Sequence, residues 1–517
     1  MRGLAAGLVL AIAILAGGVH AQSPKLEGQR QADQNDGTYL NPILAGDHPD
    51  PTILKDGDTY YATFSTFESY PGLLIWSSKD LINWQPIAPA LTQYLGSVWA
   101  PCLVKYKGRY LIYFPARSDA KRSNYVVWAD HIEGPWSAPI DLNLPKHIDP
   151  GFAVGEDGKP YLFLSGGDRI ALSDDGLATR GDIQHVAEPF IYPEDWDVES
   201  QSVEGPKITL HGDYFYMIWA EGGTAGPPTG HMVVVARSHS INGPWQLDPH
   251  NPIIRTQNKD EPWWSKGHGS LVETPGGWFM VYHGYENGYM TLGRQMLMEP
   301  VVWTNDGWFK VEPRDLAKPI KAPFSYDPYH GPSGIALSDD FATDDLGLRW
   351  SFYKGASDEG RRAQFGKGLT LTAKGDTPRT SSPLLEVAPD QAYEVETELT
   401  LTAGATAGVV LYYSDNLYVG LGLSPDKLIM HRYGTERPGN KPAGISDHIY
   451  IRMRNNHNIV SFYTSPDGHA WTKYGVEMEV SGYNHNVGGG FLSLKPGIYV
   501  AGTGAATFAY WTYRALP

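Results

Sequence analysis

Four ionisable residues hold equivalent places in successive segments of this 517-residue chain. Asp50, Asp149, Glu204 and His268 each precede the glycine of a turn by 7 to 9 residues, and Ala100 holds the same place in a fifth segment. If the segments meet in space, three carboxyl groups and one imidazole come together. Hydrolysis of a glycosidic bond needs two carboxyl groups, one that protonates the leaving oxygen and one that acts on water or on the sugar. A third negative group nearby raises the pKa of the acid.

A repeated element must position these residues. A polar turn with glycine, then an aromatic residue and an apolar strand, recurs at Gly57, Gly108, Gly158, Gly212 and Gly276, with spacings of 51, 50, 54 and 64 residues. Each copy predicts a hairpin turn that leads into a strand. A period near 50 residues with several strands per unit predicts an all-β, five-bladed β-propeller. The first strand of each blade lines the propeller axis, so residues at the start of these strands converge.

The alternative for each copy is a turn without function. Asp-Pro and Glu-Gly are common turn sequences, and a single copy favours that interpretation. Copies that recur at a regular spacing and together carry three carboxylates instead favour a functional site. Like charges at one rim of the propeller repel each other and serve no packing purpose.

The same segments resemble the family-43 glycoside hydrolases, which include β-xylosidases and α-L-arabinofuranosidases. The resemblance runs from about Asn41 to Phe309 and rests on four ordered motifs: His48-Pro49-Asp50-Pro51, Val98-Trp99-Ala100-Pro101, Ile148-Asp149-Pro150 and Val203-Glu204-Gly205-Pro206. It implies a five-bladed propeller and an inverting mechanism. On the matching positions, Asp50 would be the general base, Glu204 the general acid, and Asp149 the residue that orients the acid and raises its pKa.

The resemblance also implies residues that bind the sugar. Arg294 resembles the arginine that binds sugar hydroxyls in the terminal subsite, although a structural ion pair is the alternative. Trp99 and Phe67 resemble the aromatic walls of that pocket, and plain core packing is the alternative for Phe67. His268 resembles the histidine that faces the propeller axis.

Relatives often hold a calcium or other ion near that histidine. Calcium prefers oxygen ligands, so a contact between His268 and an ion would be secondary. We expect no cofactor to be required for the chemistry, and the sequence leaves open whether a structural calcium ion binds near His268. Neither an HExxH motif nor a Cys/His cluster indicates a catalytic transition metal.

A second domain is predicted after the propeller. We expect the catalytic domain over residues 22–322, a linker over 323–337 and a β-sandwich of short alternating strands over 338–517. This part resembles the sandwich of several propeller xylosidases, where one loop closes over the mouth of the active site and restricts the enzyme to chain ends. The alternative is a separate carbohydrate-binding module with aromatic residues on an exposed face.

Bulk properties restrict the partners and the location. A positive start, a short apolar run and small residues up to Ala21 predict a signal peptide over residues 1–21, cleaved after Ala21, and hence a secreted or periplasmic protein. The net charge is −16, without a basic cluster, which argues against nucleic acid and anionic membranes as partners. Cys102 is the one cysteine, so no internal disulfide can form.

Several functions remain open at this point. The leading hypothesis is an exo-acting hydrolase that releases terminal xylose or arabinofuranose from hemicellulose oligosaccharides, with xylan 1,4-β-xylosidase favoured over α-L-arabinofuranosidase. A retaining fructan- or sucrose-cleaving propeller fits less well, because His48-Pro49-Asp50-Pro51 stands in place of an Asn-Asp-Pro-Asn element. The non-enzymatic alternative is a carbohydrate-binding propeller with an inactive site. The sequence does not determine the linkage, the chain length accepted or the oligomeric state.

Overall fold

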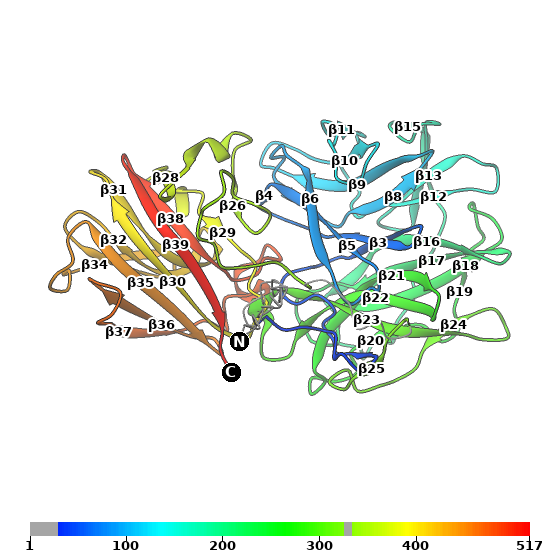
Figure 1. The fold of residues 1–517 in the computed structure, drawn as a ribbon. Helices are drawn as coiled ribbons and strands as arrows, with labels where there is room; N and C mark the ends of the chain where they lie inside the picture. The colour runs from blue at the N-terminus through cyan, green and yellow to red at the C-terminus, as the bar shows by residue number, and fades with distance from the viewer. Residues whose placement is uncertain (1–28, 325–332) are drawn as a thin grey trace, which may run out of the picture.

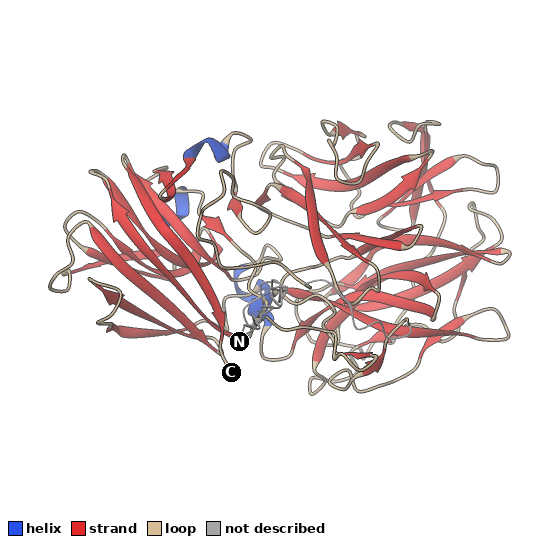
Figure 2. Ribbon diagram, viewed as in Figure 1, coloured by secondary structure: helices blue, strands red, loops and turns tan. Residues whose placement is uncertain are grey.

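The fold consists almost entirely of β-strands (Figure 2). The computed structural model describes residues 29–324 and 333–517. The predicted signal peptide over residues 1–21 and its cleavage after Ala21 lie outside the described residues, as does part of the predicted linker. None of the helices formed by the described residues is long and apolar enough to cross a bilayer.

Five antiparallel sheets follow one another along the chain and form the five blades of a propeller, as predicted (Figure 1). The first blade contains β2 (Thr52–Asp56), β3 (Thr59–Thr63), β5 (Gly72–Ser78) and β6 (Gln85–Leu91). The second contains β7 (Ser97–Val98), β8 (Cys102–Tyr106), β9 (Arg109–Arg117), β10 (Arg122–Ala129) and β11 (Ile140–Asp141). The third contains β12 (Gly151–Val154), β13 (Pro160–Leu164), β14 (Asp168–Leu172) and β15 (Thr179–His185). The fourth contains β16 (Ser200–His211), β17 (Tyr214–Gly222), β18 (Met232–Ser238), β19 (Gln246–Leu247) and β20 (Ile254–Arg255). The fifth contains β21 (Trp263–Thr274), β22 (Gly277–Glu286), β23 (Arg294–Trp303) and β24 (Phe309–Val311).

The predicted hairpin turns connect the first strands of these blades. Gly57, Gly108, Gly158 and Gly212 have φ values of 62°, 84°, 76° and 58°, a region that favours glycine. In the fifth turn Gly277 takes this role, with φ of 122°. The recurring glycine motif therefore marks a turn in each blade.

The segment before the first blade closes the ring. Strand β1 (Thr38–Tyr39) pairs with β25 (Ile320–Lys321). The backbone N–H of Ile43 donates to the carbonyl of Met296 at 2.8 Å, and the N–H of His48 donates to the carbonyl of Arg294 at 2.8 Å. This pairing holds the start of the first blade against the last blade.

The C-terminal part is a β-sandwich, as predicted. Its seven-stranded sheet has the order β27 (Ala363–Gly366), β28 (Gly368–Thr372), β39 (Ala505–Ala515), β30 (Ala392–Leu401), β35 (His448–Asn456), β36 (Ile459–Ser465) and β37 (Thr472–Glu479). The second sheet has eight strands in the order β34 (Thr435–Gly439), β33 (Leu428–Arg432), β32 (Leu417–Leu423), β31 (Ala405–Ser414), β38 (Lys495–Gly502), β29 (Leu384–Leu385), β26 (Ser351–Tyr353) and β4 (Ser69–Tyr70). The sandwich also contains the short helix α1 (His485–Gly488) and the 3-10 turns η2 (Glu359–Arg362) and η3 (Pro378–Thr380). The 3-10 turn η1 (Met290–Leu292) lies between β22 and β23 of the fifth blade.

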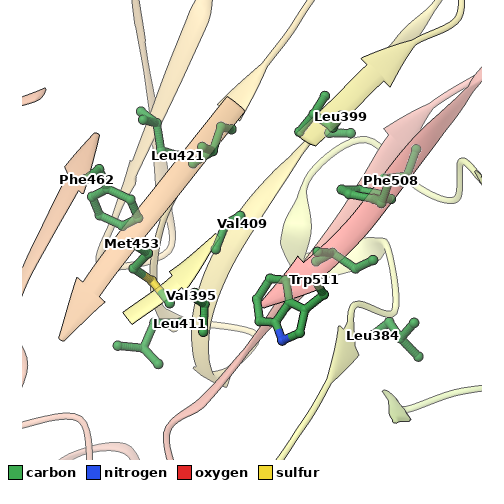
Figure 3. Close-up of a cluster of buried hydrophobic side chains, with 14 of the residues drawn as sticks. Leu384, Val395, Leu399, Val409, Leu411, Leu421, Met453, Phe462, Phe508 and Trp511 are labelled. Atoms are coloured by element: carbon green, nitrogen blue, oxygen red, sulfur yellow. The ribbon is translucent and has the colours of Figure 1, made fainter. Parts of the chain in front are cut away.

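Alternation of apolar and polar residues builds the sandwich core. On β30, Val395 and Leu399 point inward and are fully buried, while Glu396 and Glu398 lie on the opposite face. Figure 3 shows Val395 and Leu399 packed with residues of both sheets, including Trp511 of β39.

The two parts share a sheet. Strand β4 belongs to the first blade by sequence, yet Tyr70 pairs with Phe352 of β26 and so becomes the edge of the eight-stranded sandwich sheet. The Tyr70 hydroxyl also donates to the carbonyl of Ser357 at 2.7 Å. The sandwich is therefore built onto the propeller, which a separate binding module on a linker would not require.

Candidate active site

The starts of the first, third and fourth blades bring three carboxyl groups together. Asp50 and Asp149 are 6% and 5% exposed, and Glu204 is half-buried. Glu204 and Asp50 both act electrostatically on Asp149, and Asp50 acts on Glu204. The convergence expected from the repeat is thus present in the structure.

The backbone at these positions has an unusual conformation. Asp50, Asp149 and His268 have φ values of 57°, 54° and 56°, in the left-handed region that few non-glycine residues adopt. In the fourth blade Gly205 takes this conformation, with φ of 61°, directly after Glu204. A Cβ atom on Gly205 would lie 2.4 Å from Cε1 of His268, so a glycine is required there for the imidazole to fit beside Glu204.

Asp50 is held by a set of hydrogen bonds and one ion pair. Nη1 of Arg294 donates to Oδ1 at 2.7 Å, and Oγ of Ser65 donates to Oδ2 at 2.5 Å. Nδ1 of His283 accepts the backbone N–H of Asp50 at 3.0 Å. Burial is the largest single influence and raises the pKa of Asp50, but Arg294, His268 and His283 together outweigh it and hold this pKa well below its usual range. Asp50 is therefore a carboxylate across the whole neutral and mildly acidic range.

Glu204 has the opposite electrostatic setting. Burial and the negative charge of Asp50 raise the pKa of Glu204 to about 7. Burial and the negative charges of Glu204 and Asp50 raise the pKa of Asp149 well above its usual range. Two adjacent carboxyl groups of this kind hold one proton between them near neutral pH. The arrangement pairs a fixed carboxylate with a protonated acid, as acid–base hydrolysis requires.

Arg294 lies between two aromatic rings. Its guanidinium carbon is 5.7 Å from the centre of the Phe67 ring and 5.6 Å from that of Phe491, and the two rings stack at 6.5 Å. Nε of Arg294 is buried without a hydrogen-bond partner among the described residues.

The backbone of Phe67 pairs with that of Val98, the residue before Trp99, on the neighbouring blade. The N–H of Phe67 donates to the carbonyl of Val98 at 2.8 Å, and the N–H of Val98 donates back at 3.0 Å. Nε1 of the half-buried Trp99 donates to Oγ of Ser97 at 3.0 Å. The structure therefore brings Arg294 and Phe67 to Asp50, and it places Trp99 directly after the residue that pairs with Phe67.

A loop of the sandwich covers this site, and no residue of that loop was singled out from the sequence. Phe491 stacks on His485 at 3.7 Å, and its N–H donates to Nδ1 of that imidazole at 2.8 Å. Asn486 of α1 ties the loop to the propeller, since its side chain accepts from the N–H of Gly226 at 3.0 Å and donates to the carbonyl at 3.1 Å. The sequence signal was the run Gly488-Gly489-Gly490 before an aromatic residue, which is typical of a loop that places a ring.

Three buried histidines surround the axis beside Asp50. Nδ1 of His268 lies 3.3 Å from Oδ1 of Asp50, and the ring of His283 stacks parallel to that of His231 at 5.2 Å. Burial lowers the pKa of His268 to about 3 and that of His283 to about 4, so both are neutral at working pH.

These donors do not fit a directly bound calcium ion. Nε2 of His268, of His283 and of His231 has no hydrogen-bond partner among the residues that the structure describes, but calcium prefers oxygen ligands and the carboxylate of Asp50 is paired with Arg294. Within residues 29–324 and 333–517, no three His, Cys, Asp or Glu side chains are grouped so as to hold a metal ion.

Comparison with known proteins gives two family matches along the chain. The profile of Glycosyl hydrolases family 43 matches residues 39–309, and that of the Beta xylosidase C-terminal Concanavalin A-like domain matches residues 338–514. A xylan 1,3-beta-xylosidase of a Vibrio species is 29% identical over 85% of this chain and 91% of its own length. A non-reducing end alpha-L-arabinofuranosidase of Bacteroides ovatus is 34% identical over 61% of each chain. The crystal structure of a xylan beta-1,4-xylosidase from Bacillus halodurans has a TM-score of 0.79 at 26% identity, and covers 92% of this chain and 99% of that one.

Proposed function

The chain belongs to family 43 of the glycosyl hydrolases, and from this we propose that it releases single xylose units from the non-reducing end of xylo-oligosaccharides by inversion. The observation that supports the proposal most is the electrostatic contrast between its carboxyl groups. Asp50 is fixed as a carboxylate by Arg294, whereas the pKa of Glu204 is raised to about 7. An inverting glycosidase needs this pair of protonation states in its resting form.

In the proposed mechanism each carboxyl group has one role. Glu204 donates its proton to the oxygen of the leaving sugar, while Asp50 takes a proton from the water that attacks the anomeric carbon from the opposite face. Asp149 adjoins Glu204 and favours its protonated form by negative charge. The proposed chemistry uses only these side chains.

The position of Phe491 supports an exo mode of action. The sandwich loop that carries Phe491 closes one side of the site next to Arg294 and Phe67. A polymer chain therefore could not extend beyond its terminal sugar on this side. We propose that Arg294, which lies beside Asp50 and Phe67, binds hydroxyls of this terminal sugar, and that Trp99 and Phe67 line the same pocket. His268 is proposed to shape the floor of the pocket beside Asp50.

A specific observation also supports α-L-arabinofuranosidase as a second candidate activity. The Bacteroides ovatus relative that carries this name is 34% identical over the matched region. β-Xylose and α-L-arabinofuranose have similarly arranged hydroxyl groups, so one site can accept both. We favour xylose because the Vibrio xylosidase matches over 85% of this chain and because the sandwich matches the Beta xylosidase C-terminal domain. The N-terminal pattern further supports export of the protein, to the periplasm or beyond.

Proton NMR of the purified protein with 4-nitrophenyl β-xyloside, and in parallel with the α-L-arabinofuranoside, tests the proposal. We expect turnover of the xyloside with initial release of α-xylose, the inverted anomer. Initial release of the same anomer as in the substrate would contradict the inverting mechanism. Turnover of the arabinofuranoside alone would favour the second candidate, and turnover of neither by the folded protein would contradict both.

The pH dependence of kcat/KM follows from the two pKa shifts. Because Glu204 must be protonated to act, we expect kcat/KM for xylobiose to be constant in mild acid and to fall about tenfold per pH unit above its pKa of about 7. Because Asp50 must be ionised and its pKa is lowered, no loss from its protonation is expected until the pH falls below the ordinary value of 3.8. A profile that rises from pH 6 to pH 9 would contradict the assignment of Glu204 as the acid.

Removal of the Phe491 ring should weaken substrate binding. In Phe491→Ala the ring beside Arg294 is lost, and we expect kcat/KM for xylobiose to fall about tenfold, mainly through a higher KM, as for the loss of 1–2 kcal/mol of ring contacts. Tyr433→Ala, which removes a 56% exposed ring elsewhere on the sandwich, is the control and should leave both constants unchanged. Equal constants for Phe491→Ala and the wild type would exclude a role of the loop in the terminal pocket.

A further inference from the structure

The side chain of Asp47 carries a buried carboxyl group that the proposed mechanism does not use. It lies three residues before Asp50, and this side chain is 5% exposed. Oγ of Ser493, a residue of the sandwich, donates to Oδ2 of Asp47 at 2.8 Å. Nζ of Lys495, at the start of β38, lies 3.8 Å from the same oxygen. One carboxyl group of the propeller therefore contacts two residues of the sandwich.

These contacts lie at the end of the loop that carries Phe491. Ser493 follows Phe491 by two residues. The next residue, Leu494, donates its N–H to the carbonyl of Thr291 in η1 at 2.8 Å. The end of the loop is therefore attached to the propeller at two successive residues, and the bond to Asp47 is the one closer in sequence to the aromatic ring.

On its other side Asp47 lies against the turn that precedes Arg294. Gly293 has a φ value of 78°, and a Cβ atom at this position would lie 2.2 Å from Oδ1 of Asp47. The N–H of His48, the residue after Asp47, donates to the carbonyl of Arg294 at 2.8 Å. The guanidinium carbon of Arg294 is in turn 5.6 Å from the centre of the Phe491 ring. Asp47 thus lies between the two chain segments that bring Phe491 and Arg294 together.

We infer that Asp47 is a positioning residue that holds the Phe491 ring against Arg294 and thereby sets the affinity for the terminal sugar. The inference rests on the proposed function, in which Arg294 binds that sugar. Asp47 acts through the loop and does not need to touch the substrate. The run Gly488-Gly489-Gly490 before the ring gives the loop many accessible conformations. A bond that fixes the ring before the sugar arrives lowers the entropic cost of binding.

A double-mutant cycle with Phe491 tests this role, because the effects of two residues that act through one contact do not add. Asp47→Ala removes the acceptor of the Ser493 hydroxyl. We expect kcat/KM for xylobiose to fall about three- to tenfold, mainly through a higher KM, as for the ordering of one side chain on binding. In the Phe491→Ala background the same substitution should lower kcat/KM by less than about twofold. Asp47→Asn keeps an oxygen that accepts from Ser493 and should recover most of the wild-type KM.

Asp390 provides the matched control, because it also joins the sandwich to the propeller. It is 4% exposed, and its carboxyl group accepts the N–H of Arg30 at 3.1 Å and the hydroxyl of Tyr513 at 2.8 Å. Asp390→Ala leaves the buried Tyr513 hydroxyl without its acceptor, so it should lower the Tm but leave KM for xylobiose unchanged. If Asp47→Ala does not fold, Ser493→Ala breaks the same contact from the sandwich side, and the same cycle applies to it.

The outcomes separate the inference from the proposed function. A higher KM in Asp47→Ala that is absent from the Phe491→Ala background and from Asp390→Ala would support the inference. An equal loss in both backgrounds, an equal rise of KM in Asp390→Ala, or an unchanged KM in Asp47→Ala would overturn the role of Asp47 while the pentosidase activity stands. Failure of the folded wild type to cleave any pentoside would overturn the proposed function, and the inference with it.

Discussion

Asp50→Asn is expected to lower kcat/KM about 10³- to 10⁴-fold, and to do so equally for xylobiose and for 2,4-dinitrophenyl β-xyloside. An amide accepts no proton from water, and the attack of water is required whatever the leaving group. The substitution also leaves the buried Arg294 without its carboxylate at 2.7 Å. Loss of one partner of a buried pair costs about 3–5 kcal/mol, so a lower Tm is expected as well.

A control is needed because this variant changes stability and chemistry together. Asp248→Asn alters an equally buried aspartate, 3% exposed, on the outer part of the fourth blade. It should lower stability at most and leave kcat/KM unchanged. Azide, which attacks without a general base, should restore turnover of the activated xyloside by Asp50→Asn. Activity of Asp50→Asn within tenfold of the wild type would remove Asp50 from the catalytic step.

Glu204→Gln is expected to lose about 10²- to 10⁴-fold in kcat/KM on xylobiose, with a far smaller loss on 2,4-dinitrophenyl β-xyloside, whose leaving group departs without a proton. Glutamine has the shape of protonated glutamate but carries no acidic proton for the leaving oxygen. The decline in activity above pH 7 should disappear in this variant, because the group whose pKa is about 7 is gone. Initial rates across pH 5 to 9 with both substrates measure both effects.

Glu221 provides an unusually close control for Glu204. It is fully buried on the adjacent strand β17, and burial raises its pKa to about 7 as well. Its carboxyl group accepts hydrogen bonds from Nε1 of Trp219 and from the N–H of Phe190, both at 2.8 Å, and so serves the structure. Glu221→Gln should keep both the activity and the decline above pH 7. If Glu221→Gln abolishes the decline above pH 7, the decline reports the ionisation of Glu221 and not that of Glu204.

The propeller could be predicted from the sequence alone, because its signal is local and repeated. Each turn glycine needs a left-handed φ, and each of the following strands shows alternation or an apolar run. Five phased copies are enough to predict which residues stand at the start of the inner strands. Asp50, Asp149, Glu204 and His268 were found in this way, and the structure places them around one axis. The boundaries 22–322, 323–337 and 338–517 stay predictions.

The environment of each site residue could not be predicted from the sequence, because it depends on contacts between distant segments. Asp50 and Arg294 are 244 residues apart in the chain and meet only because the segment before the first blade pairs with the last blade. Phe491 arrives from the sandwich, and Ser493 of the same loop donates to Asp47 of the propeller. Such contacts produce no repeat in the sequence. Each of them is made only once, and the two segments that make it share no sequence pattern. The ionisation of Asp50 and Glu204 differs for the same reason, because burial and neighbouring charges set a pKa and both are properties of the folded chain.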